Sequence, residues 1–194
     1  CIPMLKRSDI KREAAKIINE ELTVDDSLFL YHDVCTNGIG YVDLMFKTDS
    51  IAPEQIPYLG LLKSVLGYVD TENYTYGELF NEINANTGGI NCGVEVFDRA
   101  DSTEEFQAMF SVRGKALYTK MDFLFKMIGE ILNSSKLEDT KRLYEIVASV
   151  KSRAQVNLTG AGHSTAVLRA AAYSSPMAAF QDEMAAVSYT HLRA

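Results

Sequence analysis

The hydrophobic pattern of the chain starts with a helical period. Apolar residues recur three and four positions apart over residues 11–22, and a Ser-Asp pair just before them can cap the segment, so a helix is predicted there. Two short apolar runs follow at 28–31 and 40–46, with the turn residues Thr-Asn-Gly at 36–38 between them. Because turn residues between two β-prone runs indicate a hairpin, these two runs are predicted to pair as strands.

Two helices are predicted next. Pro57 suits the first turn of a helix, and the segment 57–69 is apolar on most sides, so it is expected to be a buried helix. Thr75 is followed three residues later by Glu78, which is capping-box spacing and predicts the start of a second helix. The Gly-Gly pair at 88–89 is expected to end it, because glycine is favoured just past helix C-termini.

Strand character returns at 90–97 and 106–112, on either side of the polar turn 98–104. From residue 115 onward the spacing is helical again. Helices are predicted over 117–132, 137–156 and 165–173, with one more starting at Pro176. Strands gathered in hairpins, with the helices segregated from them, imply an α+β fold in which helices lie on one face of a largely antiparallel sheet.

Composition and charge narrow the function classes. The 194 residues are 47% hydrophobic and 23% charged, as is typical of globular proteins, and no apolar stretch approaches the roughly 20 residues of a membrane-spanning helix. The formal net charge of -7 argues against a nucleic-acid or anionic-membrane partner, because both need clustered Lys and Arg. Cys1, Cys35 and Cys92 form no C-x-x-C pair and leave an odd thiol, so a reducing cytoplasm is expected.

The histidines do not form a metal-binding pattern. His32, His163 and His191 are scattered, and none has Glu or a second His three or four residues later, as a helical metal site requires. His32 can pair with the adjacent Asp33 at a strand end, but a surface role is favoured. His163 is interpreted as a residue near a helix start rather than as a catalytic base.

Other candidates for chemistry are equally weak. The Gly-rich pieces at 37–40, 87–89 and 159–162 lack the Gly-Lys-Ser/Thr ending of a phosphate loop, so turns and helix ends explain them better. Ser164 and Ser174 lack the G-x-S-x-G pattern of a hydrolase nucleophile. Cys92 alternates within an apolar strand and is interpreted as a small buried hydrophobe. No catalytic, cofactor-binding or metal-binding residue is therefore assigned.

Several pieces together resemble one protein family. The most specific are the Asn-x-x-Thr-Gly-Gly-Ile piece ending at Ile90 and the Gly-His-Ser piece at 162–164. The remaining pieces lie at 31–33, 36–39, 41–46, 57–59 and 74–84, and the Gly-His-Ser piece continues as one run through Ser175 to Glu183. The chain resembles the third, non-catalytic domain of the presequence-protease and falcilysin-like branch of the pitrilysin/insulinase zinc metallopeptidases, over nearly its whole length up to about Ala186.

That resemblance implies a parent protein of two hinged halves, which close into a chamber around a short unstructured peptide. In the family only the first domain holds zinc, on an H-x-x-E-H helix whose two His bind the metal and whose Glu activates water. The equivalent helix here reads Leu-Gly-Leu-Leu-Lys at 59–63 and carries no ligand. The resemblance thus implies a chamber-forming domain without a cofactor of its own, inside a zinc metalloendopeptidase.

The expected organisation is a linker and leading helix over 1–25, a peptidase-like domain over 26–187 and a non-native tail over 188–194. The start at Cys1, without an initiator Met, is typical of a fragment, and a processed terminus would look the same. The expected partners are the remaining domains of the same peptidase chain and a peptide substrate, with no nucleic acid and no membrane. Two alternatives stay open: a non-enzymatic scaffold module with the same fold, and a free-standing α+β protein that binds a small ligand. The absence of converging polar residues disfavours the second.

Overall fold

The computed structural model describes Met4, Glu13, Lys16 and residues 6–10, 18–99, 101–102 and 104–186. The chain divides into two compact units, Cys1–Gly38 and Ile39–Ala194. The predicted domain boundaries after residues 25 and 187 stay predictions, and the tail 188–194 lies outside the described residues. None of the helices in the described part of the chain combines the length and the apolar character needed to span a membrane.

The first unit contains a two-stranded hairpin. β1 (Glu20–Val24) pairs antiparallel with β2 (Ser27–Tyr31), and only Asp25 and Asp26 connect the strands. Their φ angles of 47° and 65° lie in the left-handed region, as a two-residue type I′ turn requires. A 3-10 turn, η1 (Arg7–Asp9), precedes the hairpin.

Two predictions for this part of the chain are wrong. The helix predicted over 11–22 ends inside β1, and the described residues Glu13 and Lys16 before it are not helical. The physical reason is cross-strand pairing: Leu22 faces Phe29 across the hairpin, which rewards an extended backbone. The strands predicted at 28–31 and 40–46 both exist, but they do not pair with each other.

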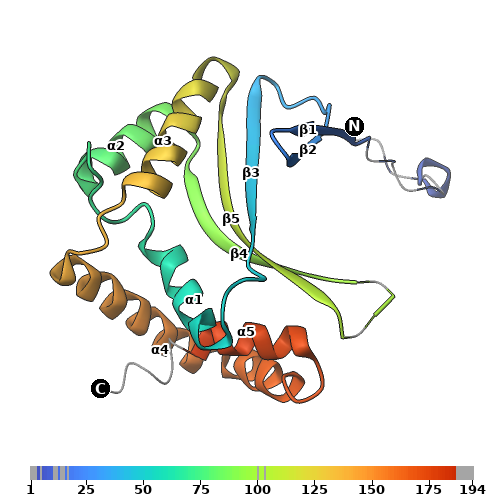
Figure 1. The fold of residues 1–194 in the computed structure, drawn as a ribbon. Helices are drawn as coiled ribbons and strands as arrows, with labels where there is room; N and C mark the ends of the chain where they lie inside the picture. Colours follow the sequence, from blue (N-terminus) through green and yellow to red (C-terminus); the bar gives the residue numbers. More distant parts are fainter. Residues whose placement is uncertain are drawn as a thin grey trace. The chain divides into compact units, whose positions relative to one another are not determined.

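The second unit is built on a three-stranded antiparallel sheet (Figure 1). The strand order is β3-β5-β4, so the long β5 (Phe106–Leu117) pairs with β3 (Ile39–Lys47) on one side and β4 (Ile90–Asp98) on the other. Alternate β5 residues are buried on one face of the sheet, namely Ala108, Phe110, Val112, Gly114 and Ala116. This alternation confirms the predicted α+β class with an antiparallel sheet.

Helices α2 (Tyr76–Asn86) and α3 (Met121–Ser134) lie along the buried face of this sheet (Figure 1). α3 begins later than predicted, because β5 continues to Leu117 and a 3-10 turn, η3 (Tyr118–Lys120), follows it. The start predicted at 117 is therefore wrong. The capping box predicted at Thr75 is confirmed: its hydroxyl accepts the Glu78 N–H at 3.3 Å, and the Glu78 carboxylate accepts the Thr75 N–H at 3.0 Å.

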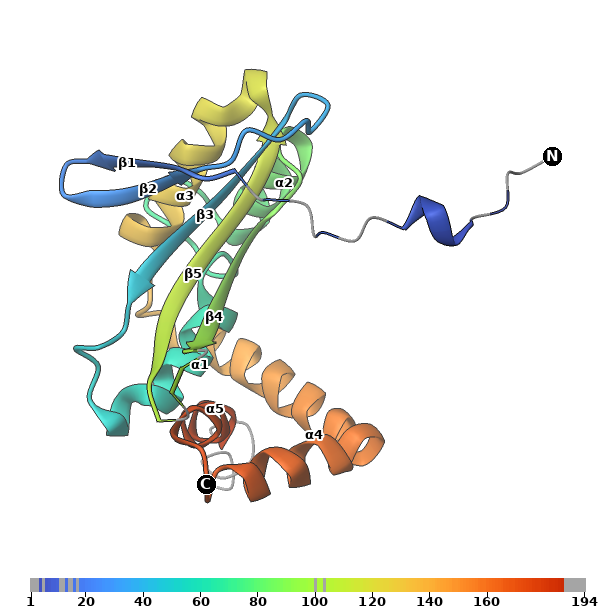
Figure 2. The same ribbon diagram turned by 90° about the vertical axis from the view of Figure 1, so that its right-hand side faces the viewer.

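Three further helices gather at one end of the sheet (Figure 2). They are α1 (Ile56–Val65), which follows the 3-10 turn η2 (Pro53–Gln55), α4 (Thr140–Ala171) and α5 (Pro176–Ala186). The sequence predicted two helices where α4 is one, but α4 has a kink at Ala161, whose φ of -135° and ψ of 36° are not helical. The kink falls between two glycines, where the break was expected.

Two hydrophobic clusters hold the helices in place. The larger joins the sheet to α1, α2 and α3 around Leu79, Leu124 and Met127, which are fully buried. The smaller packs Val65 and Val69 against Ile146 and so fixes α4 beside α1. These contacts leave a pocket between α1, α2 and α4.

Candidate functional site

The histidines and serines singled out from the sequence do not come together as a catalytic or metal site. His163 and Ser164 are exposed on α4 just past the kink, and His32 is exposed after β2. The Ser174 hydroxyl donates to the Ala171 carbonyl oxygen at 3.3 Å. His191 lies outside the described residues. Within the described ranges, no group of three or more His, Cys, Asp or Glu residues could hold a metal ion.

Cys92 and the Gly-rich pieces have structural surroundings. Burial raises the pKa of the Cys92 thiol to about 11, so the thiol stays protonated and non-nucleophilic at neutral pH. Gly89 has a φ of 107°, which only glycine adopts readily, and the Gly88 N–H donates to the Lys115 carbonyl oxygen at 2.7 Å. The Gly-Gly pair therefore turns the chain from α2 into β4, as the sequence predicted.

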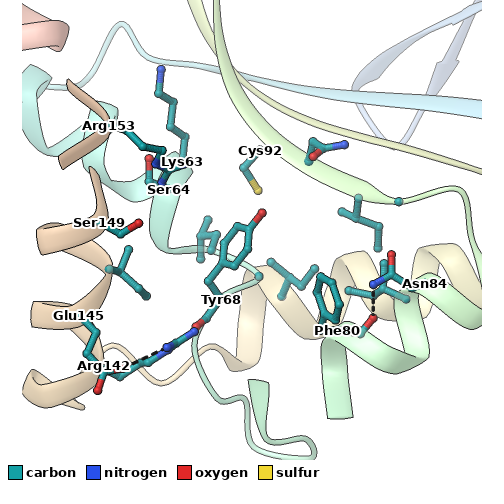
Figure 3. Close-up of a pocket in the computed structure, with 18 residues that line it drawn as sticks. Lys63, Ser64, Tyr68, Phe80, Asn84, Cys92, Arg142, Glu145, Ser149 and Arg153 are labelled. Carbon is teal, nitrogen blue, oxygen red and sulfur yellow. Dashed lines mark hydrogen bonds and ion pairs between the residues drawn. The ribbon is translucent and has the colours of Figure 1, made fainter. Parts of the chain in front are cut away.

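A pocket of about 580 Å³ lies between α1, α2, α4 and β4 (Figure 3). It borders α1, which contributes Lys63 and Ser64 to the pocket wall. The wall on this side therefore carries a basic side chain and a hydroxyl group.

One face of α4 supplies the polar side of the pocket. Arg142, Glu145, Ser149 and Arg153 follow each other three or four residues apart, so they project from the same face of the helix. The Asp139 carboxylate caps this helix by accepting the Arg142 N–H at 3.0 Å. The cap therefore fixes the start of α4 at Thr140, in the same turn as Arg142.

Arg142 is held in position by contacts of three kinds. Its Nε donates to the Tyr68 carbonyl oxygen at 2.9 Å, and its guanidinium pairs with Glu145 at 3.1 Å. The guanidinium carbon also lies 3.8 Å from the centre of the Tyr76 ring, which is cation–π geometry. Arg142 thus joins α4 to the loop after α1 and to α2, and its charge is already balanced.

The floor of the pocket is apolar and its rim is aromatic. Leu66, Ile83 and Ile131 come from the larger cluster, and Ile146 comes from the smaller one. At the rim, Tyr68 is 52% exposed and Phe80 is 57% exposed, although both are large aromatic side chains. An aromatic rim over an apolar floor favours a ligand with an apolar part.

The opposite face of the sheet carries a cluster of paired charges. Arg113 of β5 lies between two carboxylates, with Asp43 of β3 at 2.7 Å and Glu95 of β4 at 3.1 Å. The hydrogen bond to Asp43 is the main cause of the raised pKa of Arg113. Because these charges neutralise one another, this cluster is a brace across the three strands rather than an open ion-binding site.

The pocket was not predicted from the sequence. The one usable signal in the sequence is the spacing of Arg142, Glu145, Ser149 and Arg153, which marks a polar face on a helix. A polar face is ordinarily a solvated surface, however, and no local pattern shows that α1 packs beside it. The pocket depends on long-range packing, which hydrophobic periodicity does not encode.

Comparisons with known proteins identify the family of this chain. A family model for domains associated with the subfamily C peptidases of peptidase family M16 matches residues 1–193. The chain is 36% identical over 188 residues to protein HypA of Clostridium perfringens, covering 97% of this chain and 19% of that protein. It is 29% identical over 188 residues to the mitochondrial presequence protease of Yarrowia lipolytica, again 97% of this chain and 19% of that protein.

The chain also matches a similar fraction of a plant relative. The chain is 27% identical over 189 residues to presequence protease 1, chloroplastic/mitochondrial, of Arabidopsis thaliana, covering 97% of this chain and 17% of that protein. The chain thus spans less than one fifth of the length of these relatives. The family model covers nearly every residue, and it agrees with the resemblance inferred from the sequence pieces. The chain belongs to the family of domains associated with the subfamily C peptidases of family M16.

Proposed function

We propose that this chain is a non-catalytic, chamber-forming domain of a larger zinc metalloendopeptidase that degrades short unstructured peptides. The observation that carries the proposal is the family match over residues 1–193, together with relatives that are named presequence proteases. In this function the domain supplies part of the wall that faces the peptide, and it contacts the remaining domains of the same chain.

The surroundings of α1 support the non-catalytic part of this proposal. A peptidase that uses zinc-activated water needs two or three metal ligands and a carboxylate near the metal. At the corresponding helix this chain has Leu59, Leu62 and Lys63, none of which carries a carboxylate or an imidazole. The zinc of the parent enzyme would therefore be held by a different domain.

The pocket supports the proposal that this domain forms part of the chamber wall. An inert spacer has no need of a pocket of about 580 Å³ with an apolar floor and a basic side. A wall that contacts unfolded peptides does need such a surface, because a peptide presents apolar side chains and charged ends together. The pocket beside α1 is thus the part of the domain most suited to meet the substrate.

The test uses the full-length protein encoded by the gene from which this chain comes. Its reading frame is expected to encode an H-x-x-E-H helix, and the purified protein is expected to degrade a quenched short peptide until zinc is chelated. A photocrosslinking amino acid at the pocket rim, Phe80→benzoylphenylalanine, is expected to capture the peptide. The matched control is Tyr144→benzoylphenylalanine, at an aromatic residue that is 75% exposed on α4 and does not line the pocket.

Two results would contradict the proposal. A full-length protein without H-x-x-E-H and without zinc-dependent turnover would point to the scaffold alternative, in which the fold serves assembly alone. Equal crosslinking at positions 80 and 144 would show that peptide does not meet the domain at the pocket.

The proposed compartment is the cytoplasm. The thiols support this location, since Cys35 and Cys92 are both free and Cys35 is exposed. An exposed free thiol suits a reducing compartment better than an oxidising one. Fractionation of the source cells, followed by detection of the full-length protein, tests this location, and recovery from an oxidising compartment would contradict it.

A further inference from the structure

We propose that the pocket between α1, α2 and α4 binds the C-terminal residue of a peptide, with Lys63 and Arg153 holding the carboxylate and the pocket floor receiving an apolar side chain. The choice of a peptide rests on the proposed function. The recognition of a carboxylate next to an apolar group rests on the pocket itself.

The pocket carries an excess of positive charge. Three cationic side chains line it, those of Lys63, Arg142 and Arg153, against the single carboxylate of Glu145. Arg142 and Glu145 pair with each other. Among the described residues, Lys63 and Arg153 have no ion-pair partner, so two positive charges stay unbalanced in a chain whose net charge is -7. An acidic protein that places two unbalanced cations in one concave site creates local attraction for an anion.

The two unpaired cations come from different helices but lie in one wall of the pocket. Lys63 comes from α1 and Arg153 from α4, and Figure 3 shows both on the same side of the pocket, with Ser64 near them. A guanidinium presents a planar pair of N–H donors that matches the two oxygens of a carboxylate, and an ammonium adds a mobile point charge. Ser64 and Ser149 can donate further hydrogen bonds from the same wall.

The apolar floor of the pocket favours a carboxylate attached to an apolar group over a free inorganic anion. Leu66, Ile83 and Ile131 form a floor that offers nothing to a small hydrated anion but would bury an aliphatic or aromatic side chain. Tyr68 and Phe80 at the rim would lose much of their exposed surface when such a side chain enters. The volume of about 580 Å³ exceeds what one side chain needs and admits the last residues of a peptide.

The C-terminus of a peptide joins these features in one residue. It carries an α-carboxylate one carbon away from its own side chain, so both groups can be held at once. Internal Asp or Glu residues carry the charge without the adjacent apolar group. A fatty acid has the same two groups without a peptide backbone, and the test includes one to distinguish the two sources.

The experiment is a calorimetric titration of the full 194-residue chain with N-acetyl-Ala-Ala-Ala-Leu as the free acid and as the C-terminal amide. We expect the amide to bind at least tenfold more weakly, which corresponds to about 1.4 kcal/mol. Added salt should weaken binding of the acid more than binding of the amide, because only the acid pairs with the cations.

The variant Lys63→Gln/Arg153→Gln should lose the same factor of ten for the free acid and little for the amide. Its matched control is Lys47→Gln/Lys141→Gln, which removes the same charge from exposed positions outside the pocket and should change either affinity by less than about twofold. Thermal melts that coincide for both variants would show that the loss does not come from unfolding.

Three results would overturn the proposal: equal affinity for acid and amide, full binding by the Lys63/Arg153 variant, or octanoate binding as tightly as the peptide acid. Each leaves the proposed function untouched, because zinc-dependent turnover by the full-length protein is measured separately. Conversely, a full-length protein without peptidase activity would leave the difference between acid and amide measurable on this chain.

Discussion

Leu124 of α3 packs so closely on Gly114 of β5 that a β-carbon built at position 114 would lie 2.7 Å from the Leu124 Cδ1 atom. Leu124 is completely buried, so it has little room to withdraw. The closeness of the helix to the sheet therefore depends on a residue without a side chain.

We predict that Gly114→Ala lowers the free energy of unfolding by about 1–3 kcal/mol, because overpacking a tight core forces side chains off their preferred rotamers. Urea unfolding followed by circular dichroism measures the change. The matched control is Gly77→Ala in α2, where a β-carbon would meet nothing within 4 Å. There alanine should stabilise by up to about 1 kcal/mol through its higher helix propensity. Equal midpoints for the two variants would mean that α3 does not lie on β5 as described.

Gly114 also shows why the length of β5 was harder to predict than the two ends of α2. Local signals with a direct mechanism, such as the Thr75–Glu78 capping box and the Gly-Gly pair after α2, predicted their elements correctly. By contrast, the strand predicted at 106–112 continues to Leu117 through the polar residues Arg113 and Lys115. They are exposed on one face of β5, while Gly114 between them is buried on the other.

The pairing of the strands was predicted less well than their positions. The sequence placed strands at 28–31 and 40–46 correctly but joined them as a hairpin, because the Thr-Asn-Gly turn residues lie between them. In the structure β3 pairs instead with β5, about 70 residues away along the chain, and the Asp43–Arg113 ion pair lies across that long-range contact. No local pattern marks such a partner, and the pocket depends on distant contacts of the same kind.

The capping box at the start of α2 gives a second stability prediction. Thr75→Ala removes the hydroxyl that accepts the Glu78 N–H, and we expect a loss of about 1 kcal/mol in the free energy of unfolding. Thr75→Ser keeps the hydroxyl and should retain most of the stability. Chemical denaturation of both variants is the measurement. A serine variant as unstable as the alanine one would show that the methyl group of Thr75, and not the cap, is what matters.

Glu130 gives a prediction about pH. Its side chain is buried and accepts from the Asn73 amide at 2.9 Å and from the Asn73 N–H at 3.2 Å. Hydrogen bonds from the Thr71 and Asn73 side chains lower the pKa of Glu130 below its ordinary value of 4.5. A carboxyl whose pKa is lower in the folded state stabilises the fold above its unfolded-state pKa, and the contribution is lost as the pH falls through the folded-state pKa.

We therefore expect Glu130→Gln to be less stable than the wild-type chain at pH 7, by about 1.5 kcal/mol for the loss of charge-assisted hydrogen bonds. The difference should begin to shrink as the pH falls below about 4.5, where the carboxyl of the unfolded chain takes up a proton, and should disappear once the pH is below the lower folded-state pKa. Thermal melts between pH 3 and pH 7 (roughly the range in which a carboxyl titrates) measure it. Glu138→Gln, at an exposed carboxylate, is the control. A difference between Glu130→Gln and wild type that stays constant across this range would contradict the assigned role.

The lack of a ligand cluster in the described residues leads to a prediction about metal. We expect the purified chain, after dialysis, to hold far less than one zinc per molecule and to show no turnover of a quenched peptide, with or without added zinc. Metal analysis by mass spectrometry and a fluorescence assay measure the two quantities. One tightly bound zinc per chain, or turnover that a chelator abolishes, would show that this domain has a metal site after all.

The last prediction concerns β3, an end strand of its sheet among the residues that the structure describes. The Thr48 N–H donates to the Ala108 carbonyl oxygen at 3.4 Å, and N–H groups alternate in direction along a strand. Leu44 therefore directs its N–H toward β5, whereas Met45 directs its N–H away from the sheet. An edge of nine residues is a template for pairing with another chain, so we expect self-association at micromolar concentrations.

Proline substitutions at Met45 and at Leu44 distinguish the effect of edge pairing on self-association from the effect of lost hydrogen bonds on stability. Met45→Pro removes an outward N–H and should reduce self-association with little loss of stability, because proline is tolerated where a strand edge is open. Leu44→Pro removes an N–H bonded to β5 and should destabilise the sheet by about 3 kcal/mol or more. Sedimentation velocity and thermal melts distinguish the two effects. If the unmodified chain is a clean monomer, or if Met45→Pro and Leu44→Pro unfold alike, then the β3 edge is not an open pairing surface, and the register inferred from the Thr48 hydrogen bond fails with it.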